Sequence, residues 1–252
     1  SYTDSVACAP GESVEVKTNL ALLDENVANG NFDQNAEYII QACLELAEET
    51  PWADAGFDVA FGEGIIFKPE QYIVLPQKSG DLELLDTGFN YGVVGKNFRV
   101  LFSNGVGGLV SYQVGGIEYL GDMLRPNFWR APTDNDNGNK MAFRDGVWRN
   151  AGRFAKCVGH EGKLLEHCAQ ISYKLQLATL PVEAYVTLTY SVYPSGQIQV
   201  DLDYTKAEGL PELPEFGVLM PLKSHFSDLD YYGRGSYANY PDRKDGYKLG
   251  FY

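Results

Sequence analysis

The 252-residue chain has little cysteine, little histidine and a shortage of positive charge. Its four cysteines are too few for the disulfide framework of a small secreted domain. With 34 acidic against 20 basic side chains, the formal net charge is −14, which excludes nucleic acid and argues against an anionic membrane as a partner. The chain has no glycosylation sequon, no apolar run of membrane-spanning length and no charged-then-apolar leader. These absences predict a soluble, intracellular protein.

Metal-ligand residues cluster once, in the order C-x2-H-x6-H-C at Cys157, His160, His167 and Cys168. The residue types suit zinc, but the gap between the two histidines differs from the common finger spacings. His167 and Cys168 would also point to opposite faces of a strand. Two strand ends that carry these residues by coincidence explain the cluster better, so we expect no metal site in this chain.

Aromatic residues are plentiful, at 13% of the chain with 17 tyrosines, and favour β structure. Alternation of apolar and polar residues, bounded by Gly and Pro turns, predicts strands at 59–67, 98–102, 109–114, 117–120, 171–177, 185–193, 198–204 and 216–222. The run 187–191 shows the pattern best, because Thr187, Thr189 and Ser191 alternate with apolar neighbours. A mainly antiparallel sandwich is therefore expected from residue 81 onward.

The first third of the chain is harder to interpret. Residues 1–33 are polar, with one strand predicted at 13–20 and a turn at 29–31. Residues 38–46 fit helical and strand periodicity equally well, so periodicity leaves that segment open. Residues 69–80 combine two prolines, Ser79 and Gly80 around one short apolar run, which is typical of a linker.

One helix is predicted in the second half of the chain. Residues 141–153 place Phe143, Val147, Trp148 and Ala151 at helical spacing.

The stretch Pro126–Asn139 contains two prolines, two adjacent aromatic residues, an arginine and a run of Asp and Asn, a combination that no other part of the chain has. Pro126 and Pro132 fix φ and remove two donors, while the run of Asp and Asn before Gly138 can bond its own backbone. We expect an ordered loop. A calcium loop of the EF-hand type does not fit, because Gly138 at position six would put Arg144 at position twelve, where a bidentate Glu is needed.

Two sequence motifs carry a family resemblance. They resemble the two signature stretches of the C-terminal domain of large bacterial β-galactosidases, glycoside hydrolase family 2. The first is Asn127-Phe128-Trp129-Arg130-Ala131-Pro132-Thr133-Asp134-Asn135-Asp136-Asn137-Gly138, and the second is Tyr232-Gly233-Arg234-Gly235-Ser236-Tyr237-Ala238-Asn239-Tyr240-Pro241-Asp242-Arg243. A third stretch is similar to the end of the immunoglobulin-like domain that precedes this C-terminal domain in the family. It is Glu49-Thr50-Pro51-Trp52-Ala53-Asp54-Ala55-Gly56. The chain departs from the family at Ser236 and Ala238, where Pro and Glu are usual.

The resemblance implies a mainly β fold in two parts. Residues 1–69 would be the C-terminal part of an immunoglobulin-like β-sandwich, 70–80 a linker, and 81–252 a galactose-mutarotase-like β-supersandwich that is incomplete at its C-terminus. Residues 38–46 are then assigned to a strand. The family's two catalytic glutamates lie on a (β/α)8 barrel, and no alternating βα pattern is found here. A truncated β sandwich would expose edge strands and self-associate.

The implied role is therefore non-catalytic. In the parent enzyme, retaining hydrolysis of terminal β-D-galactosides needs two carboxyl groups about 5–5.5 Å apart, and the resemblance assigns neither to this chain. It implies the catalytic barrel and a galactoside substrate as partners, a homo-oligomeric parent in the bacterial cytoplasm, no cofactor within this chain, and Mg²⁺ or Na⁺ for the parent. The substrate-rim candidates are Trp129, Arg130, Asp134 and Asp136. The motif residues with a structural role are Phe128, Pro132, Asn135, Gly138, Gly233, Arg234, Gly235, Asn239, Tyr240, Asp242 and Arg243.

Two interpretations compete with substrate contact at the first motif. Phe128 and Trp129 would offer an apolar platform to a sugar, or Trp129 would lie in the core while Arg130, paired with Asp134 or Asp136, braces the loop. For the chain as a whole, a stand-alone carbohydrate-binding module and an aldose 1-epimerase stay open as alternatives. An epimerase would need an acid histidine, for which His225 is the candidate.

Overall fold

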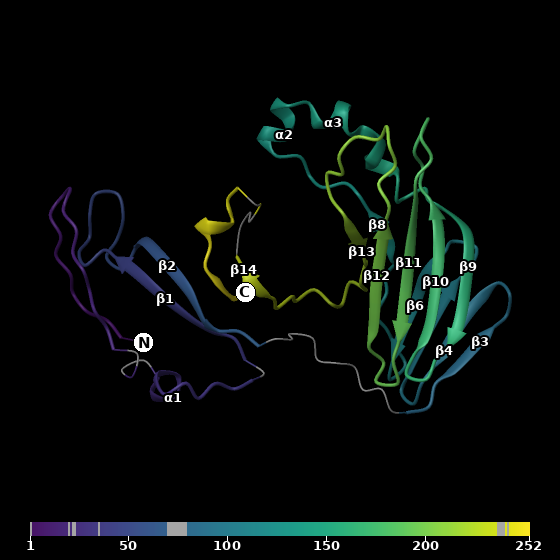
Figure 1. Ribbon diagram of the computed structural model, residues 1–252, viewed down its shortest axis with the longest axis horizontal. Coiled ribbons are helices and arrows are strands. Elements are labelled where there is room, and N and C mark those ends of the chain that lie inside the picture. The colour runs from purple at the N-terminus through teal and green to yellow at the C-terminus, as the bar shows by residue number, and fades with distance from the viewer. Residues whose placement is uncertain are drawn as a thin grey trace. The chain divides into compact units, whose positions relative to one another are not determined.

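The computed structural model describes residues 2–19, 21, 24–34, 36–69, 80–235, 240 and 242–252 (Figure 1). The chain forms two compact units: Leu75–Asp228 is one, and Ser1–Val74 together with Leu229–Tyr252 is the other. Of the expected linker at 70–80, only Gly80 lies within the described residues. The domain limits expected from the sequence stay a prediction.

The larger unit is built on two antiparallel sheets, as the sequence predicted. The five-stranded sheet follows the chain order β3 (Glu83–Asp86), β4 (Asn90–Val94), β5 (Phe98–Ser103), β6 (Gly108–Val114) and β7 (Ile117–Glu118). The four-stranded sheet has the order β12 (Ile198–Tyr204), β11 (Tyr185–Val192), β10 (Ala169–Gln176) and β9 (Lys156–Leu164). In both sheets each strand pairs with the next one along the chain, so the two sheets are antiparallel meanders.

The core lies between these sheets. Along β10 every second side chain is buried, beginning with Ala169, because successive side chains of a strand point to opposite faces. The ring of Phe102 on β5 lies 5.0 Å from the ring of Tyr190 on β11. The buried hydroxyl of Tyr173 on β10 donates a hydrogen bond to Asn104 Oδ1, at 3.0 Å, just after β5. Apolar packing and several polar contacts, of which this is one, thus join the two sheets.

The stretch Pro126–Asn139, called the motif loop below, lies at one end of this sandwich (Figure 1). It is preceded by β8 (Arg125–Asn127), which pairs with β13 (Gly217–Leu219), and it leads into α2 (Asp134–Gly138), α3 (Met141–Arg144) and the 3-10 helix η2 (Gly146–Asn150). The expectation that 126–139 is loop throughout was wrong in two places, because Pro126 and Asn127 belong to an edge strand and Asp134–Gly138 form a helical turn capped by Thr133.

The single helix predicted at 141–153 was also wrong, because the segment divides into α3 and η2. Lys140 enters α3 with φ of 62°, and Asp145 leaves helical geometry with φ −110° and ψ 8°. At that position the buried Asp145 carboxylate bonds the Arg144 guanidinium. A buried carboxylate needs a hydrogen-bonding or charged partner, and this need interrupts the helix that the apolar spacing predicts.

The smaller unit contains two hairpins and a short helix, α1 (Glu25–Ala28). One hairpin pairs β1 (Tyr38–Glu45) with β2 (Asp58–Phe67), and the other pairs β14 (Tyr232–Arg234) with β15 (Leu249–Phe251) after the 3-10 helix η3 (Lys244–Gly246). The strands expected at 38–46 and 59–67 are confirmed. The strand expected at 13–20 was wrong for the described residues 13–19, where no pairing partner provides a ladder.

Within the part of the chain that the structure describes, no helix combines the length and the apolar content needed to cross a bilayer.

Candidate functional site

Phe128 fixes the start of the motif loop in the core. Its side chain is 1% exposed, and its ring lies 5.7 Å from the ring of Trp148 and 6.2 Å from the ring of Phe216. The next residue, Trp129, is only partly buried against the same core. The Asn127 side-chain amide donates to the Trp129 carbonyl at 2.9 Å and holds the turn between them. Phe128 is thus unavailable as a sugar platform in this structure, whereas part of Trp129 reaches the surface.

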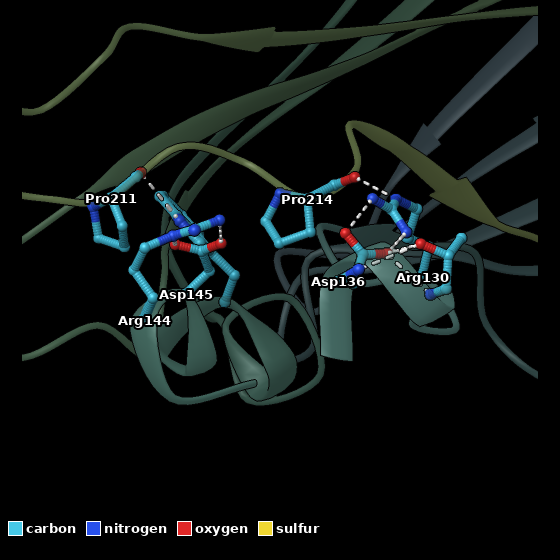
Figure 2. A network of polar contacts seen from close by, with 8 residues as sticks. Arg130, Asp136, Arg144, Asp145, Pro211 and Pro214 are labelled. Atoms are coloured by element: carbon cyan, nitrogen blue, oxygen red, sulfur yellow. Dashed lines mark hydrogen bonds and ion pairs between the residues drawn. The ribbon is translucent and has the colours of Figure 1, made fainter. Parts of the chain in front are cut away.

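Arg130 and Asp136 form the central contact of the loop (Figure 2). The guanidinium donates to both carboxylate oxygens, with Nη2 lying 3.0 Å from Oδ1. Its Nε donates to the Pro214 carbonyl at 3.0 Å, on the segment between β12 and β13. Arg130 therefore connects the motif loop to a distant part of the same unit, and the bidentate geometry makes the pair specific.

The Arg130–Asp136 ion pair braces the loop, and Thr133 adds further hydrogen bonds to the Asp136 carboxylate. Its backbone N–H and hydroxyl donate to Asp136 Oδ2 at 2.8 and 3.0 Å, and its hydroxyl accepts from the Asp136 N–H at 3.2 Å. This reciprocal arrangement is a capping box, which satisfies donors at the start of α2. The carboxylate of Asp136 thereby fixes both the arginine and the helix.

The Arg130 guanidinium and the Thr133 backbone N–H hold the pKa of Asp136 well below its usual range, against the opposing effect of desolvation. The side chain is 11% exposed and stays ionised at neutral pH. It can accept hydrogen bonds but cannot donate a proton to a leaving group, so Asp136 is unsuited to general acid catalysis.

A second brace follows in the chain (Figure 2). Arg144 Nε and Nη2 donate to the two carboxylate oxygens of Asp145 at 3.0 and 2.8 Å, and this contact raises the pKa of Arg144. Trp148 Nε1 donates to the Pro211 carbonyl at 3.1 Å. The carbonyls of Pro211 and Pro214 thus accept from Trp148 and Arg130, which ties the segment 211–214 to the motif region at two points.

The outer face of the loop is polar and exposed. Pro132, Asp134, Asn135 and Gly138 are exposed, and Phe143 beyond them is 91% exposed. Of the four rim candidates, Arg130 and Asp136 hold each other, whereas Asp134 and part of Trp129 face outward. Sequence reasoning left Asp134 and Asp136 as equal partners for Arg130, and it missed Asp145, Pro211 and Pro214, for which the sequence carries no signal.

The second motif lies in the smaller unit. Gly233 and Arg234 belong to β14, and Arg234 Nη1 donates to Glu63 Oε2 at 3.0 Å and to the Tyr247 carbonyl at 2.7 Å. Glu63 on β2 also accepts from the Leu249 N–H at 2.7 Å, so it connects both hairpins. No sequence signal pointed to Glu63. Of the other motif residues, Gly235, Tyr240, Asp242 and Arg243 are described, whereas Asn239 and the two departures at Ser236 and Ala238 lie outside the described residues.

The histidines have ordinary structural partners. His160 Nδ1 lies 3.0 Å from the Tyr91 hydroxyl, and Cys157 Sγ donates to the Gly159 carbonyl at 3.6 Å. His225 is exposed, with its ring 4.2 Å from that of Phe226. Among the described residues, no group of three or more His, Cys, Asp or Glu side chains is arranged to hold a metal ion.

The fold and the loop define a mainly β, sandwich-type region with a braced loop at one end. Residues 94–252 match the family described as "Beta galactosidase small chain", and the chain belongs to that family. The resemblance drawn from the two motifs is thereby confirmed.

Curated relatives agree with this family assignment. The chain is 34% identical to a β-galactosidase of Clostridium acetobutylicum over 223 residues, which covers 88% of this chain and 25% of the relative. It is 36% identical to a β-galactosidase of Lactobacillus delbrueckii subsp. bulgaricus over 222 residues, or 87% of this chain and 21% of the relative. A β-galactosidase small subunit of Latilactobacillus sakei is 32% identical over 181 residues, or 64% of this chain and 56% of that protein. The chain thus spans about a quarter or less of the large relatives.

Proposed function

We propose that this chain is the non-catalytic C-terminal region of a β-galactosidase that hydrolyses terminal β-D-galactosides with retention, its catalytic barrel lying outside this chain. One observation carries the proposal: nearly nine-tenths of the chain matches only a quarter or less of proteins named β-galactosidase. The relative named a small subunit supports the idea that such a region works together with a separate large part.

Within the assembled enzyme, the motif loop would form part of the rim of the galactoside site. Arg130 and Asp136 brace the loop, and the outward-facing side chains of Asp134 and Trp129 make contact with the sugar. A carboxylate oxygen accepts hydrogen bonds from sugar hydroxyls, and an indole ring packs against the apolar face of a pyranose. The two carboxyl groups that perform retaining chemistry belong to the barrel.

The remaining properties of the parent enzyme follow the same family assignment. We propose a cytoplasmic, homo-oligomeric bacterial enzyme that takes Mg²⁺ or Na⁺ at sites outside this chain. The two alternatives, a stand-alone carbohydrate-binding module and an aldose 1-epimerase, are not favoured, because the named relatives are β-galactosidases.

Complementation tests the proposal. The chain is purified alone and is also co-expressed with the remainder of its parent polypeptide, and hydrolysis of a nitrophenyl β-galactoside is measured in each preparation. We expect no turnover by the chain alone, none or little by the remainder alone, and restored turnover by the two together.

Two results would contradict the proposal. Turnover by the isolated chain that survives repurification would place catalytic groups within it. Calorimetric binding of free galactose or lactose by the isolated chain at millimolar affinity or better would favour the binding module instead.

A further inference from the structure

A basic cavity of about 260 Å³ lies in the larger unit, at the first residues of the motif region. Three basic residues line it: Arg125 on β8, Arg153 after η2 and Lys156 at the start of β9. Cys157 and Leu175 contribute from the four-stranded sheet, and Gly105 contributes from the turn between β5 and β6. We refer to this site as the basic cavity.

Two close backbone approaches build the cavity. A Cβ added at Gly152 would lie 2.0 Å from the Pro126 carbonyl oxygen, so this glycine lets the backbone before Arg153 lie directly against β8 and Arg125. Gly107 has φ of +74°, and a Cβ there would lie 2.6 Å from Leu175 Cδ2 and 2.9 Å from Cys157 Cβ. The turn is therefore held tightly over the sheet, and the walls of the cavity are formed before any ligand arrives.

The charge of the cavity is opposite to that of the chain, whose net charge is −14. Arg125 has one acidic neighbour, Asp122, whose largely exposed carboxylate lies 3.5 Å from Nη1. Arg153 lies with its guanidinium carbon 5.5 Å from the centroid of the Phe154 ring. Within the described residues, no carboxylate forms an ion pair with Arg153 or Lys156. Three basic residues thus line one cavity, and Asp122 is the one carboxylate among the described residues that forms an ion pair with any of them.

We propose that the basic cavity binds a small phosphate-type oxyanion, either free inorganic phosphate or the phosphate group of a sugar phosphate. Guanidinium groups match the geometry of phosphate oxygens and donate charge-assisted hydrogen bonds to them. The volume lies just below the range of about 300–1,000 Å³ typical of sites for drug-sized ligands, which suits a small anion with its waters. A polyanion does not fit, because the rest of the acidic surface would repel it.

Cys157 provides a direct readout, because this residue lines the cavity and burial raises the pKa of its thiol. The intact chain is treated with iodoacetamide with and without 10 mM inorganic phosphate, and alkylation of each cysteine is followed by peptide mass spectrometry. We expect phosphate to slow alkylation of Cys157 several-fold and to leave the exposed Cys8 and Cys43 unchanged.

Charge-neutral variants assign the effect to the cavity. The double variant Arg125→Gln/Arg153→Gln should lose the protection of Cys157. Arg99→Gln removes an exposed arginine of β5 that does not line the cavity, so it should keep the protection. Circular dichroism confirms that each variant is folded. Protection that persists in the folded double variant, or that is lost equally in the control, would overturn the proposal.

Calorimetry then distinguishes the two sources of the anion. Inorganic phosphate, a hexose 6-phosphate and the same hexose without phosphate are titrated into the chain. Binding of inorganic phosphate as tight as that of the hexose phosphate identifies free phosphate as the ligand, whereas about tenfold tighter binding of the hexose phosphate identifies a sugar phosphate. We expect each arginine removed to weaken binding about tenfold. The proposal fails if neither phosphate binds at 10 mM, or if the unphosphorylated hexose binds equally well.

Discussion

The Arg130 guanidinium holds both carboxylate oxygens of Asp136 and at the same time donates to the Pro214 carbonyl. One side chain therefore links a helix cap, a conspicuous sequence motif and a segment that follows the four-stranded sheet. The arrangement explains why the motif combines an arginine with a Thr-x-x-Asp cap, because the cap orients the carboxylate that the arginine needs. It also leaves Asp134 exposed.

The ion pair between Arg130 and Asp136 should make the free energy of unfolding depend on pH in the acidic range. Because the folded-state pKa of Asp136 lies below its unfolded value of about 3.9, the contribution is complete above that pH and is lost as the pH falls toward the folded-state pKa. Asp136→Asn should lower the urea midpoint at pH 7, and the difference from wild type should shrink as the pH falls below about 4. Urea titrations between pH 7 and pH 3 measure this difference. Asp134→Asn is the matched control, and an equal loss in that variant would contradict a specific role for Asp136.

Thr133 should contribute through its hydroxyl. Thr133→Ala removes the acceptor for the Asp136 N–H and one donor to its carboxylate, and should lower the free energy of unfolding by about 1 kcal/mol. Thr133→Ser keeps the oxygen and should recover most of that loss. The two variants are compared by urea denaturation, and a serine variant as unstable as the alanine variant would show that the methyl group matters rather than the cap.

Two phenylalanines of the motif region should respond in opposite ways to truncation. Phe128→Ala leaves a cavity beside Trp148 and should lower the free energy of unfolding by about 3–5 kcal/mol. Phe143→Ala removes a side chain that is 91% exposed and should change the free energy of unfolding of the isolated chain by less than about 0.5 kcal/mol. Denaturant unfolding followed by circular dichroism measures both values. Similar losses in the two variants would be incompatible with the burial described here.

The indole of Trp148 should matter through its N–H as well as its size. Trp148→Phe leaves the Pro211 carbonyl without this donor, so we expect a loss of about 1–3 kcal/mol in the free energy of unfolding. Trp52 is 65% exposed, and Trp52→Phe is the matched control, with an expected change within about 0.5 kcal/mol. Thermal and urea unfolding of the two variants provide the comparison, and an unchanged Trp148→Phe protein would mean that the bond to Pro211 contributes nothing.

The hydrogen bond from Tyr173 to Asn104 is open to a similar test. Tyr173→Phe removes the hydroxyl that donates to Asn104 Oδ1, and leaves a buried acceptor without that donor. We expect a loss of about 1–3 kcal/mol. Tyr2→Phe, at an exposed tyrosine, should be neutral. A double-mutant cycle with Asn104→Ala reports the coupling between the two residues, and a coupling of zero would argue against the contact.

The strands of the sandwich were largely predictable from the sequence. Alternation along residues 185–193 and 198–204 reflects one buried and one outward face, and this is a local property of any half-buried strand. The segment 38–46 was different, because its pattern fitted helix and strand alike, and pairing with residues 58–67 decided for strand. The segment 13–20 had strand-like composition, yet no described strand pairs with residues 13–19.

The site was predictable in kind but not in detail. The motif identified the family, and the sequence pointed to a brace between Arg130 and one of two aspartates. It gave no reason to prefer Asp136, because that choice depends on the Thr133 cap and on the placement of Arg130 by the Pro214 carbonyl. The interpretation that buried Trp129 was wrong in this detail, because Phe128 enters the core and Trp129 is only partly buried.

The sequence by itself therefore determined the strand pattern, the family and the residues from which the loop is built, because these depend on local periodicity and on a specific motif. Only the tertiary structure decided which aspartate is held, where the predicted helix breaks and how Arg125, Arg153 and Lys156 come to share one cavity. The shared cavity depends on contacts between residues far apart in the chain, and the held aspartate and the helix break depend on which side chains the fold buries. Hydrogen bonding of buried polar groups and close packing of backbone at glycine act only after the chain has folded.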